Sequence, residues 1–352
     1  MDVIEVQAGV ACPVPTADYK HVVLAHGGGG KLTQQLIERV IAPQFSNEFL
    51  APLHDGAIFS VPGTRLAFST DSYVVHPCFF PGGNIGELAV YGTVNDLSMC
   101  GARPLFLSVA FIIEEGFMMD DLRRVVASMK EAAGRASVQL VTGDTKVVDR
   151  GKGDGIFVNT SGVGVVEGEV NISPRRASTG DRIIINGPIG LHGIAIMSAR
   201  QGLEFESPVV SDTAPLNSLV RKMLDVCKDI HVLRDPTRGG VSSALNEIAQ
   251  QAHAGIRILE DSIPVTEEVR GACEILGLDP LYVANEGKVI AFVPPHAADD
   301  VVAAMRRHPL GEQATVIGEV VSDHPGVVVM KTLIGGNRVV DMLSGEQLPR
   351  IC

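Results

Sequence analysis

The chain has 352 residues, 45 % of them hydrophobic, with a formal net charge of -12 and an isoelectric point near 5.3. This length and apolar content favour two domains with buried cores, and the negative charge argues against a nucleic-acid or anionic-membrane partner. The N-terminal residues MDVIEVQAGV lack the features of a secretory signal, and no apolar run approaches the ~20 residues that span a bilayer, so we expect a cytoplasmic protein.

Strand-like and helical patterns alternate through the first half of the chain. Residues 1–20 show no clear period, so we expect an extended arm. The apolar run HVVLAH at 21–26 is strand-like, and apolar residues at helical spacing predict a helix over 31–45. The other elements expected here are strands over 65–75, 104–113, 138–143 and 155–166, and helices over 84–101 and 120–134.

A polar stretch at 167–181 lacks apolar periodicity and predicts a domain boundary. The elements expected beyond it are strands over 182–187, 288–293, 313–321 and 326–332, and helices over 193–201, 212–226 and 238–252. We therefore expect an α/β or α+β chain with one domain over 21–168, a second over 169–340, and a flexible tail over 341–352.

The segment HGGGGK at 26–31 places four glycines directly before a predicted helix. Glycines let the backbone approach a ligand closely, and a helix N-terminus attracts anions, so the segment suits a phosphate. It is not a P-loop, because Ala25 stands where the first glycine is required and Leu32 follows the lysine. An esterase oxyanion hole would need a G-x-S-x-G nucleophile, which the sequence lacks, and a plain flexible loop is the remaining interpretation.

Acidic and amide residues recur at turns and strand ends in the first half. They are Asp55, Asp71, Asn95, Asp96 and Asp144. If these oxygens converge, they form a site for Mg²⁺, which usually accompanies nucleotide phosphates. Taken singly, an Asp beside Gly, Ser or Thr is more often a turn or helix-cap residue. Lys146, two residues after Asp144 on an expected loop, favours phosphate binding.

Three segments of the second half contain candidate functional residues. DPTRGGV at 235–241 places Arg238 and two glycines at a helix start, which again suits an anion. GPIGLHG at 187–193 lacks the G-x-G-x-x-G spacing of a dinucleotide fold. ANEGKVI places Glu286 before an apolar strand, where it is either a partly desolvated base or a hydrated loop residue.

The six cysteines form no CxxC pair and no closely spaced framework, so neither a zinc site nor a disulfide scaffold is predicted. Four of them have apolar neighbours and are expected to be core residues: Cys78, Cys100, Cys227 and Cys273. Cys352 is the last residue. From Asp341 an extended tail would carry its thiol up to ~40 Å, which predicts a mobile nucleophile.

Eight segments, taken together and in order, resemble a family of ATP-using enzymes. They are LAHGGGG, LAFSTDSYVVHPCFFPGGNIGELAVYGTVNDLSM, EEG, VTGDTKVV, LRDPTRGGV, ANEGK, HPLG and the terminal PRIC. The chain resembles the superfamily of aminoimidazole ribonucleotide synthetase, selenophosphate synthetase and thiamine-monophosphate kinase, and within it the HypE family of hydrogenase maturation proteins.

The resemblance implies a two-domain aminoimidazole ribonucleotide synthetase-like fold. The sheet of its N-terminal α/β domain pairs across a homodimer, and its C-terminal domain is α+β. It also implies ATP and Mg²⁺ near the cleft. By position, the implied metal and phosphate set is Asp55, Asp71, Asp96 and Asp144. The implied nucleotide contacts are Gly28, Gly29, Gly30, Lys31, Asn95, Asp144, Thr145 and Lys146.

The family also implies a reaction. A HypF-type carbamoyltransferase places a carbamoyl group on Cys352, which is dehydrated with ATP to a thiocyanate. The cyanide then passes to iron held by a HypC–HypD complex, for nickel–iron hydrogenase. Lys146 and Arg238 are the implied cations, and Glu286 and His192 the candidates for proton transfer. Family members usually read G-D-H-G at 190–193, but Leu191 stands here, so Glu286 is favoured over His192.

Two alternatives remain at this point. Selenophosphate synthetase uses the same fold, but places a reactive cysteine or selenocysteine in its glycine-rich loop, and HGGGGK has none. A non-catalytic adaptor would use PRIC only as a docking peptide, and would keep its function in a Cys352→Ala chain.

Overall fold

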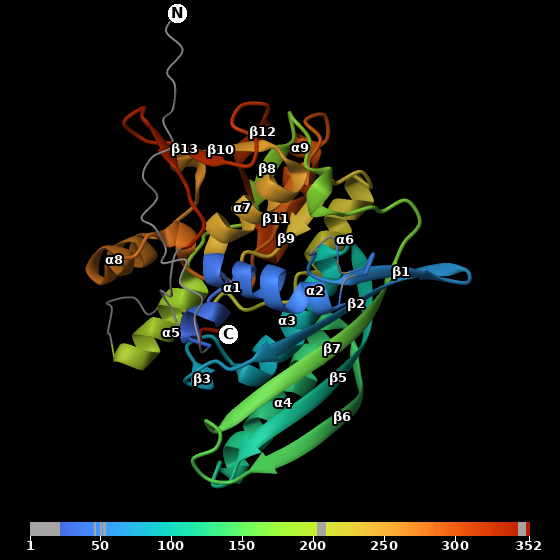
Figure 1. The fold of residues 1–352 in the computed structure, drawn as a ribbon, viewed down its shortest axis with the longest axis vertical. Helices are drawn as coiled ribbons and strands as arrows, with labels where there is room; N and C mark the ends of the chain where they lie inside the picture. The colour runs from blue at the N-terminus through green and yellow to red at the C-terminus, as the bar shows by residue number, and fades with distance from the viewer. Residues whose placement is uncertain (1–21, 46, 50, 52–53, 203–208, 344–349) are drawn as a thin grey trace, which may run out of the picture.

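The computed structural model describes residues 22–45, 47–49, 51, 54–202, 209–343 and 350–352, so the predicted arm at 1–20 lies outside the described residues. The described chain forms two lobes, each built on one sheet and packed against each other (Figure 1). Within these residues, no helix is both long and apolar enough to cross a bilayer.

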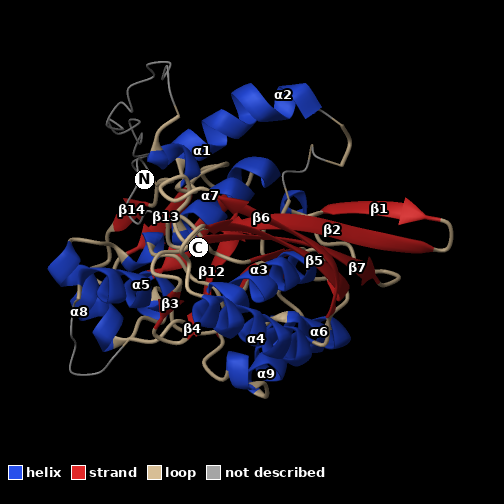
Figure 2. Cartoon of the chain, turned by 90° about the horizontal axis from the view of Figure 1, so that it is seen from below, coloured by secondary structure: helices blue, strands red, loops and turns tan. Residues whose placement is uncertain are grey.

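The first lobe is a five-stranded sheet in the order β1-β2-β7-β5-β6. Its strands are β1 (Ala57–Val61), β2 (Thr64–Tyr73), β5 (Ala102–Glu114), β6 (Gln139–Val148) and β7 (Ile156–Val166). Only β5 and β6 pair in parallel. Burial alternates residue by residue along β7, as in a strand with one covered face. Helices α3 (Ile85–Met99) and α4 (Met119–Ala136) cover that face (Figure 2).

Helix α3 lies between the two sheets and is buried on almost every side. The Asn84 side chain caps its first turn by accepting from the backbone N–H groups of Gly86 and Glu87. A Cβ atom on Gly92 would lie 2.1 Å from the Tyr73 hydroxyl, so the helix packs on β2 more closely than a side chain at this position allows. This helix therefore carries any polar residue of its inner face to the boundary between the lobes.

The second lobe is a seven-stranded sheet in the order β14-β13-β10-β12-β8-β11-β9. Its strands are β8 (Arg182–Ile185), β9 (Val232–Arg234), β10 (Gly255–Leu259), β11 (Ile290–Val293), β12 (Thr315–Val321), β13 (Val328–Lys331) and β14 (Asn337–Val339). Its helices are α5 (Leu191–Gln201), α6 (Asn217–Val226), α7 (Gly240–Ala252), α8 (Glu267–Leu276) and α9 (Ala298–Arg306). A small ribbon, β3 (Phe79–Phe80) with β4 (Gly83–Asn84), completes the strands described.

The first described segment, from Leu24 to Phe45, is mainly helical and not extended. HVVLAH contains a 3₁₀-helix, Leu24–Gly27, so the strand-like interpretation is wrong. Its backbone groups pair locally, with the N–H of Gly28 donating to Ala25 O. The helix predicted over 31–45 is confirmed as α1 (Lys31–Leu36), a π turn (Ile37–Ile41) and α2 (Ala42–Phe45).

Most predicted elements are confirmed, but two more predictions need correction. β6 continues from Gln139 to Val148 because it pairs with β5 along this whole length, so Asp144 and Lys146 lie on a strand and not on a loop. α6 begins at Asn217, and residues 212–216 are not helical. The short strands β9 and β10 and the helices α8 and α9 were not predicted. The chain passes from the first sheet to the second between Val166 and Arg182.

Candidate active site

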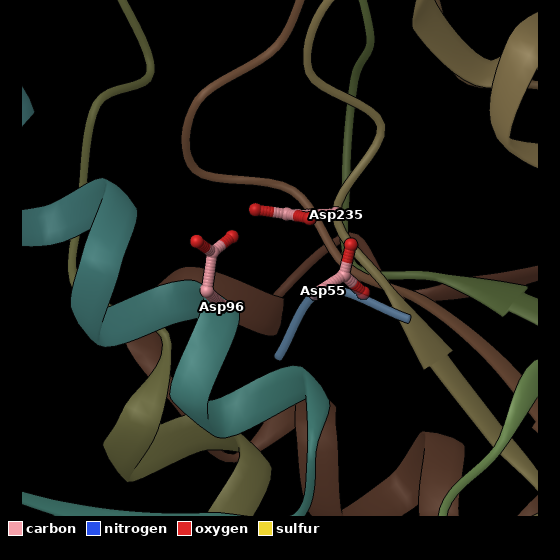
Figure 3. Close-up of side chains that lie close together, drawn as sticks. All are labelled: Asp55, Asp96 and Asp235. Atoms are coloured by element: carbon pink, nitrogen blue, oxygen red, sulfur yellow. The ribbon is translucent and has the colours of Figure 1, made fainter. Parts of the chain in front are cut away.

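Three aspartates meet where α3 faces the end of β9 (Figure 3). The carboxylates of Asp55, Asp96 and Asp235 each place an oxygen within 4.8 Å of the others. Asp55 lies just before β1, and its carboxylate pairs with Arg234 at 2.5 Å. Asp96 comes from α3 and accepts a hydrogen bond from Ser69 Oγ at 2.7 Å. Carboxylate oxygens so close together suit a hard divalent cation such as Mg²⁺.

The electrostatics of this cluster also favour a cation. Burial, and then the neighbouring aspartates, raise the pKa of Asp96 well above its usual range. Burial and Asp55 raise the pKa of Asp235 to about 7. Burial acts against ionisation of Asp55 too, but the Arg234 guanidinium outweighs it and holds its pKa below the usual range. Buried Asp55 Oδ2 has no hydrogen-bond partner among the described residues. The residues present therefore fit a Mg²⁺ ion.

A cavity of about 490 Å³ opens beside this cluster, between the N-terminal helix and α7. Asp55 and Arg234 lie at one side of it, and Gly29 and Gly30 at another. The Gly29 backbone has φ +73°, and a Cβ atom there would lie 2.8 Å from Arg238 Cβ, so only glycine fits. The glycine loop therefore packs directly against the DPTRGGV segment and forms part of the cavity wall.

Arg238 lies between this loop and the last residues of the chain. Its guanidinium donates to Gly27 O at 3.2 Å and lies 4.0 Å from Asp71 Oδ1. The pKa of Arg238 is raised, first by the nearby Cys352 and then by Asp71, against the effect of burial. Asp71 is outside the three-carboxylate cluster. Arg238, which was predicted as a cation for the phosphoryl group, thus lies near the terminal cysteine.

The last three residues are docked in the interior. Ile351 and Cys352 are 1 % and 5 % exposed. The N–H of Val74 donates to Cys352 O at 3.1 Å, and the N–H of His76 donates to Arg350 O at 3.2 Å, so these residues lie alongside the chain that follows β2. Residues 344–349 of the predicted flexible tail lie outside the described residues.

The Cys352 thiol faces the predicted base. Burial raises the pKa of this thiol well above its usual range; Arg238 opposes the shift, and Glu286, which also hydrogen-bonds to the thiol, adds to it. Glu286 is 4 % exposed, and its Oε1 has no hydrogen-bond partner within the described part of the chain. Burial, and then Asp235 and Asp212, raise its pKa well above the usual range. A group attached to the thiol would meet this carboxyl.

His192 binds the tail backbone. Its Nε2 lies 2.7 Å from Ile351 O and its Nδ1 lies 2.8 Å from Ser211 Oγ. Since a carbonyl oxygen only accepts, Nε2 carries the proton and Nδ1 accepts from the serine. Burial lowers the pKa of His192, which favours this neutral form, although Asp212 acts in the opposite direction. This geometry supports docking of the tail more than the role of a base.

Other predicted contacts are not brought to this site. Asp144 and Lys146 pair with each other at 2.7 Å on the edge strand β6, where their side chains are 62 % and 68 % exposed. Thr145, between them, is also exposed. Lys31 pairs with Asp341. Gly28 follows the 3₁₀-helix as its C-cap.

Asn95 joins the two lobes. Its Nδ2 donates to Ala214 O at 3.1 Å and to Glu286 O at 3.2 Å, and its Oδ1 accepts from the N–H of Leu216 at 2.8 Å. These contacts occupy its amide, so the structure favours a clamp over a nucleotide contact.

The sequence reasoning missed Asp235, Arg234 and Asp212. Asp235 opens the DPTRGGV segment, directly after the apolar residues of β9. In the first half of the chain, an Asp at the end of a strand indicates a candidate site residue. The same pattern indicates Asp235. Asp212 follows a stretch with no periodic pattern, and no comparable signal marks it.

Two family models match the chain. Residues 53–166 match the N-terminal domain of AIR synthase related proteins, and residues 178–331 match the C-terminal domain. Carbamoyl dehydratase HypE of Bradyrhizobium diazoefficiens is 55 % identical over 332 residues, which cover 94 % of this chain and 96 % of the relative. Carbamoyl dehydratase HypE of Escherichia coli K12 is 45 % identical over 94 % of this chain and 99 % of the relative.

Solved structures agree with these matches. The HypE–HypF complex contains a chain 49 % identical to this one, with a TM-score of 0.84 over 88 % of this chain and 99 % of that one. HypE in complex with ATP is 51 % identical, with a TM-score of 0.80 over 94 % and 100 % of the two chains. The fold and the matched domains place this protein among the two-domain AIR synthase related proteins. Within that class, the chain belongs to the HypE family of hydrogenase maturation proteins.

Proposed function

We propose that this protein dehydrates an S-carbamoyl group on Cys352 to a thiocyanate with ATP, and so supplies cyanide ligands for the iron of nickel–iron hydrogenase. One observation carries the proposal: the buried Cys352 thiol lies near Glu286, Arg238 and Asp71, and Glu286 in turn lies near Asp235 of the aspartate cluster. The names of the relatives, carbamoyl dehydratase HypE, support the reaction, and the HypE structure in complex with ATP supports the nucleotide.

The aspartate cluster would hold Mg²⁺ and the cavity would hold ATP. Asp55, Asp96 and Asp235 are the metal ligands in this proposal, with Asp71 beside them. A bound Mg²⁺ would neutralise the cluster and stabilise the charge of the phosphate oxygens. Gly29 and Gly30 line this cavity, so the phosphates of a bound ATP would lie against the glycine loop.

The chemistry assigns a role to each group around the thiol. The carbamoyl oxygen attacks the γ-phosphoryl group of ATP and ADP leaves; the carbon–oxygen bond then breaks and inorganic phosphate departs. The nitrogen loses two protons, and a carbon–nitrogen triple bond forms. Glu286 faces the thiol and takes a proton from the nitrogen. Arg238 stabilises the phosphoryl charge. His192 holds the tail through Ile351 O.

A homodimer would complete the site. The first sheet exposes apolar side chains on its uncovered side and at its edges: Phe68, Phe106, Ile112, Val141 and Val147. A second copy that covers them would bury this surface and bring Asp144, Thr145 and Lys146 of its β6 strand toward the nucleotide. Lys146 then acts as a second cation, supplied by the partner.

The other partners follow from the chemistry. A HypF-type carbamoyltransferase supplies the carbamoyl group, and the solved HypE–HypF complex supports this partner. A HypC–HypD complex receives the cyanide. Because this chemistry serves a cytoplasmic maturation pathway, we place the protein in the cytoplasm.

Intact mass measurement tests the function. The protein is incubated with a HypF-type carbamoyltransferase and carbamoyl phosphate, and then with Mg²⁺ and ATP. We expect a gain of one carbamoyl group, followed by loss of one water only after ATP is added. Cys352→Ala should show neither change, whereas Cys78→Ala, a matched control at a half-buried thiol, should show both. Absence of the mass gain with an active transferase would refute the proposal.

A further inference from the structure

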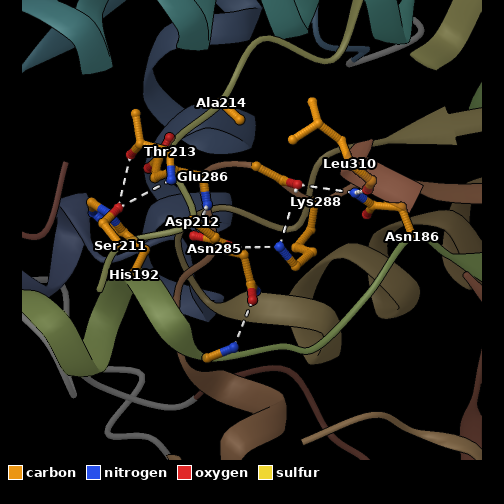
Figure 4. A network of polar contacts seen from close by, with 12 residues as sticks. Asn186, His192, Ser211, Asp212, Thr213, Ala214, Asn285, Glu286, Lys288 and Leu310 are labelled. Carbon is orange, nitrogen blue, oxygen red and sulfur yellow. Dashed lines mark hydrogen bonds and ion pairs between the residues drawn. The ribbon is translucent and has the colours of Figure 1, made fainter. Parts of the chain in front are cut away.

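A buried polar network lies behind Glu286 and connects it with the histidine that binds the tail (Figure 4). Ser211 Oγ lies 2.8 Å from His192 Nδ1. The next residue, Asp212, accepts a hydrogen bond from the N–H of Glu286 through Oδ1 at 3.2 Å. Two consecutive residues of one segment therefore contact both the histidine that docks the tail and the glutamate that faces its cysteine.

Asp212 forms a buried ion pair. Its Oδ2 lies 2.9 Å from Lys288 Nζ, and the two side chains are 4 % and 9 % exposed. Burial acts against its charge, but Lys288 and His192 outweigh burial and hold the pKa of Asp212 below the usual range. A buried ion pair contributes little net stability because both charges lose their hydration. Here it fixes the carboxylate, since Lys288 holds one oxygen and leaves the other for Glu286.

The backbone of Glu286 is held from several directions. Asn95 Nδ2 donates to Glu286 O at 3.2 Å. A Cβ atom on Gly287 would lie 1.9 Å from Asp212 O, so the two segments are in direct backbone contact and only glycine fits. Asn186 Nδ2 donates to Gly287 O at 3.1 Å. The main chain of Glu286 is thus fixed, while its Oε1 has no partner in the described part of the chain.

We propose that Asp212 is a positioning residue for the dehydration, because its carboxylate holds the Glu286 backbone so that the Glu286 carboxyl faces the group on Cys352. The inference rests on the proposed function, in which Glu286 takes a proton from the carbamoyl nitrogen. Asp212 does not touch that group. It acts through Glu286, and a displacement of about 1 Å at a reacting group lowers a rate by roughly 10²-fold.

Two double variants test this role, namely Asp212→Asn with Lys288→Met and Asp212→Ala with Lys288→Met. Both remove the ion pair, and neither leaves a buried lysine without its partner. Only the first keeps an oxygen that accepts from the N–H of Glu286. Each protein is carbamoylated on Cys352 and mixed with Mg²⁺ and ATP, and the loss of water is followed by intact mass in a single turnover. The KM for ATP is measured in parallel.

We expect the Asn double variant to dehydrate within about threefold of the parent rate, and the Ala double variant to be slower by roughly 30- to 100-fold. The KM for ATP should change by less than about threefold in both. Equal rates in the two double variants overturn the positioning role, and so does a raised KM with an unchanged rate. If thermal melting shows that the Ala double variant does not fold, Asp212→Val with Lys288→Met replaces it, with the same expected loss.

Glu286→Gln in the same assay separates this inference from the proposed function. If this variant dehydrates at the parent rate, Glu286 is not the base and the positioning role of Asp212 falls with that assignment, while the dehydration itself stands. If it is inactive while the two double variants react equally fast, only the positioning role of Asp212 is overturned.

Discussion

Replacing Asp235 with asparagine should stabilise the protein and remove its response to Mg²⁺. The carboxylate oxygens of the cluster lie within 4.8 Å of one another. At this distance, and with an effective dielectric constant near 20, two unit charges repel by about 3 kcal/mol. Part of this repulsion is already relieved, because the pKa of Asp235 is raised to about 7 and the group is partly protonated at neutral pH. We therefore expect Asp235→Asn to raise the free energy of unfolding by about 1–3 kcal/mol without metal.

The stability gained by Asp235→Asn should increase with pH. The folded protein holds the Asp235 proton up to about pH 7, whereas the unfolded chain releases it near the ordinary aspartate pKa of 3.8. Ionisation therefore destabilises the folded state progressively as the pH rises from about 4, and fully above about 7. The gain in melting temperature of Asp235→Asn over the parent should be larger at pH 8 than at pH 5.

Differential scanning fluorimetry measures both effects. Mg²⁺ with a non-hydrolysable ATP analogue should raise the melting temperature of the parent and leave that of Asp235→Asn nearly unchanged. Asp225→Asn is the matched control, since Asp225 lies in an exposed ion pair on α6 and should behave as the parent. A melting temperature for Asp235→Asn at or below that of the parent at pH 8 would refute the reasoning, as would an undiminished response to the nucleotide.

Four further predictions concern the proposed reaction and the proposed dimer. Glu286→Gln should accept the carbamoyl group but slow its dehydration by about 10²- to 10⁴-fold, measured by single-turnover intact mass; a rate near that of the parent contradicts its role as base. His192→Phe removes the donor to the tail and should slow dehydration about tenfold without changing the shape of the pH–rate profile, whereas a base at this position would change it. Ile112→Glu, on the exposed face of the first sheet, should give a monomer by size-exclusion chromatography with light scattering, and Lys146→Ala should slow dehydration while the dimer stays intact.

The sequence predicted those elements that carry a long periodic pattern. Helix α3 and the strands on either side of it were expected in nearly the observed places, because apolar runs with clear ends formed them. β9 has three residues, too few to show any period. β6 was expected to end at Gly143, but pairing with β5 extends it to Val148. The position at which such a strand ends depends on a hydrogen-bonded neighbouring strand that is distant in sequence.

In the candidate site, too, local patterns were predictable and long-range contacts were not. Glycines, aspartates and the terminal cysteine were found by residue type and spacing. What local sequence does not show is which residues meet: Asp235 joins Asp55 from 180 positions away, and His192 binds Ile351 O. His192 was considered as a base because its sequence neighbours were visible, while its hydrogen-bond partners were not. A side chain's role follows from its partners in space, which local sequence does not record.

The residues that hold the docked tail differ from those that line the cavity. Among the described residues, those that hold the tail include Val74, His76, His192 and Arg200, and none of these lines the cavity beside the glycine loop. A spent nucleotide can therefore leave and a fresh one enter while the tail stays docked. Because docked Cys352 is 5 % exposed, a labile group on its thiol would be protected from hydrolysis as long as the tail stays docked. The molecule would release its cargo only when the tail itself undocks.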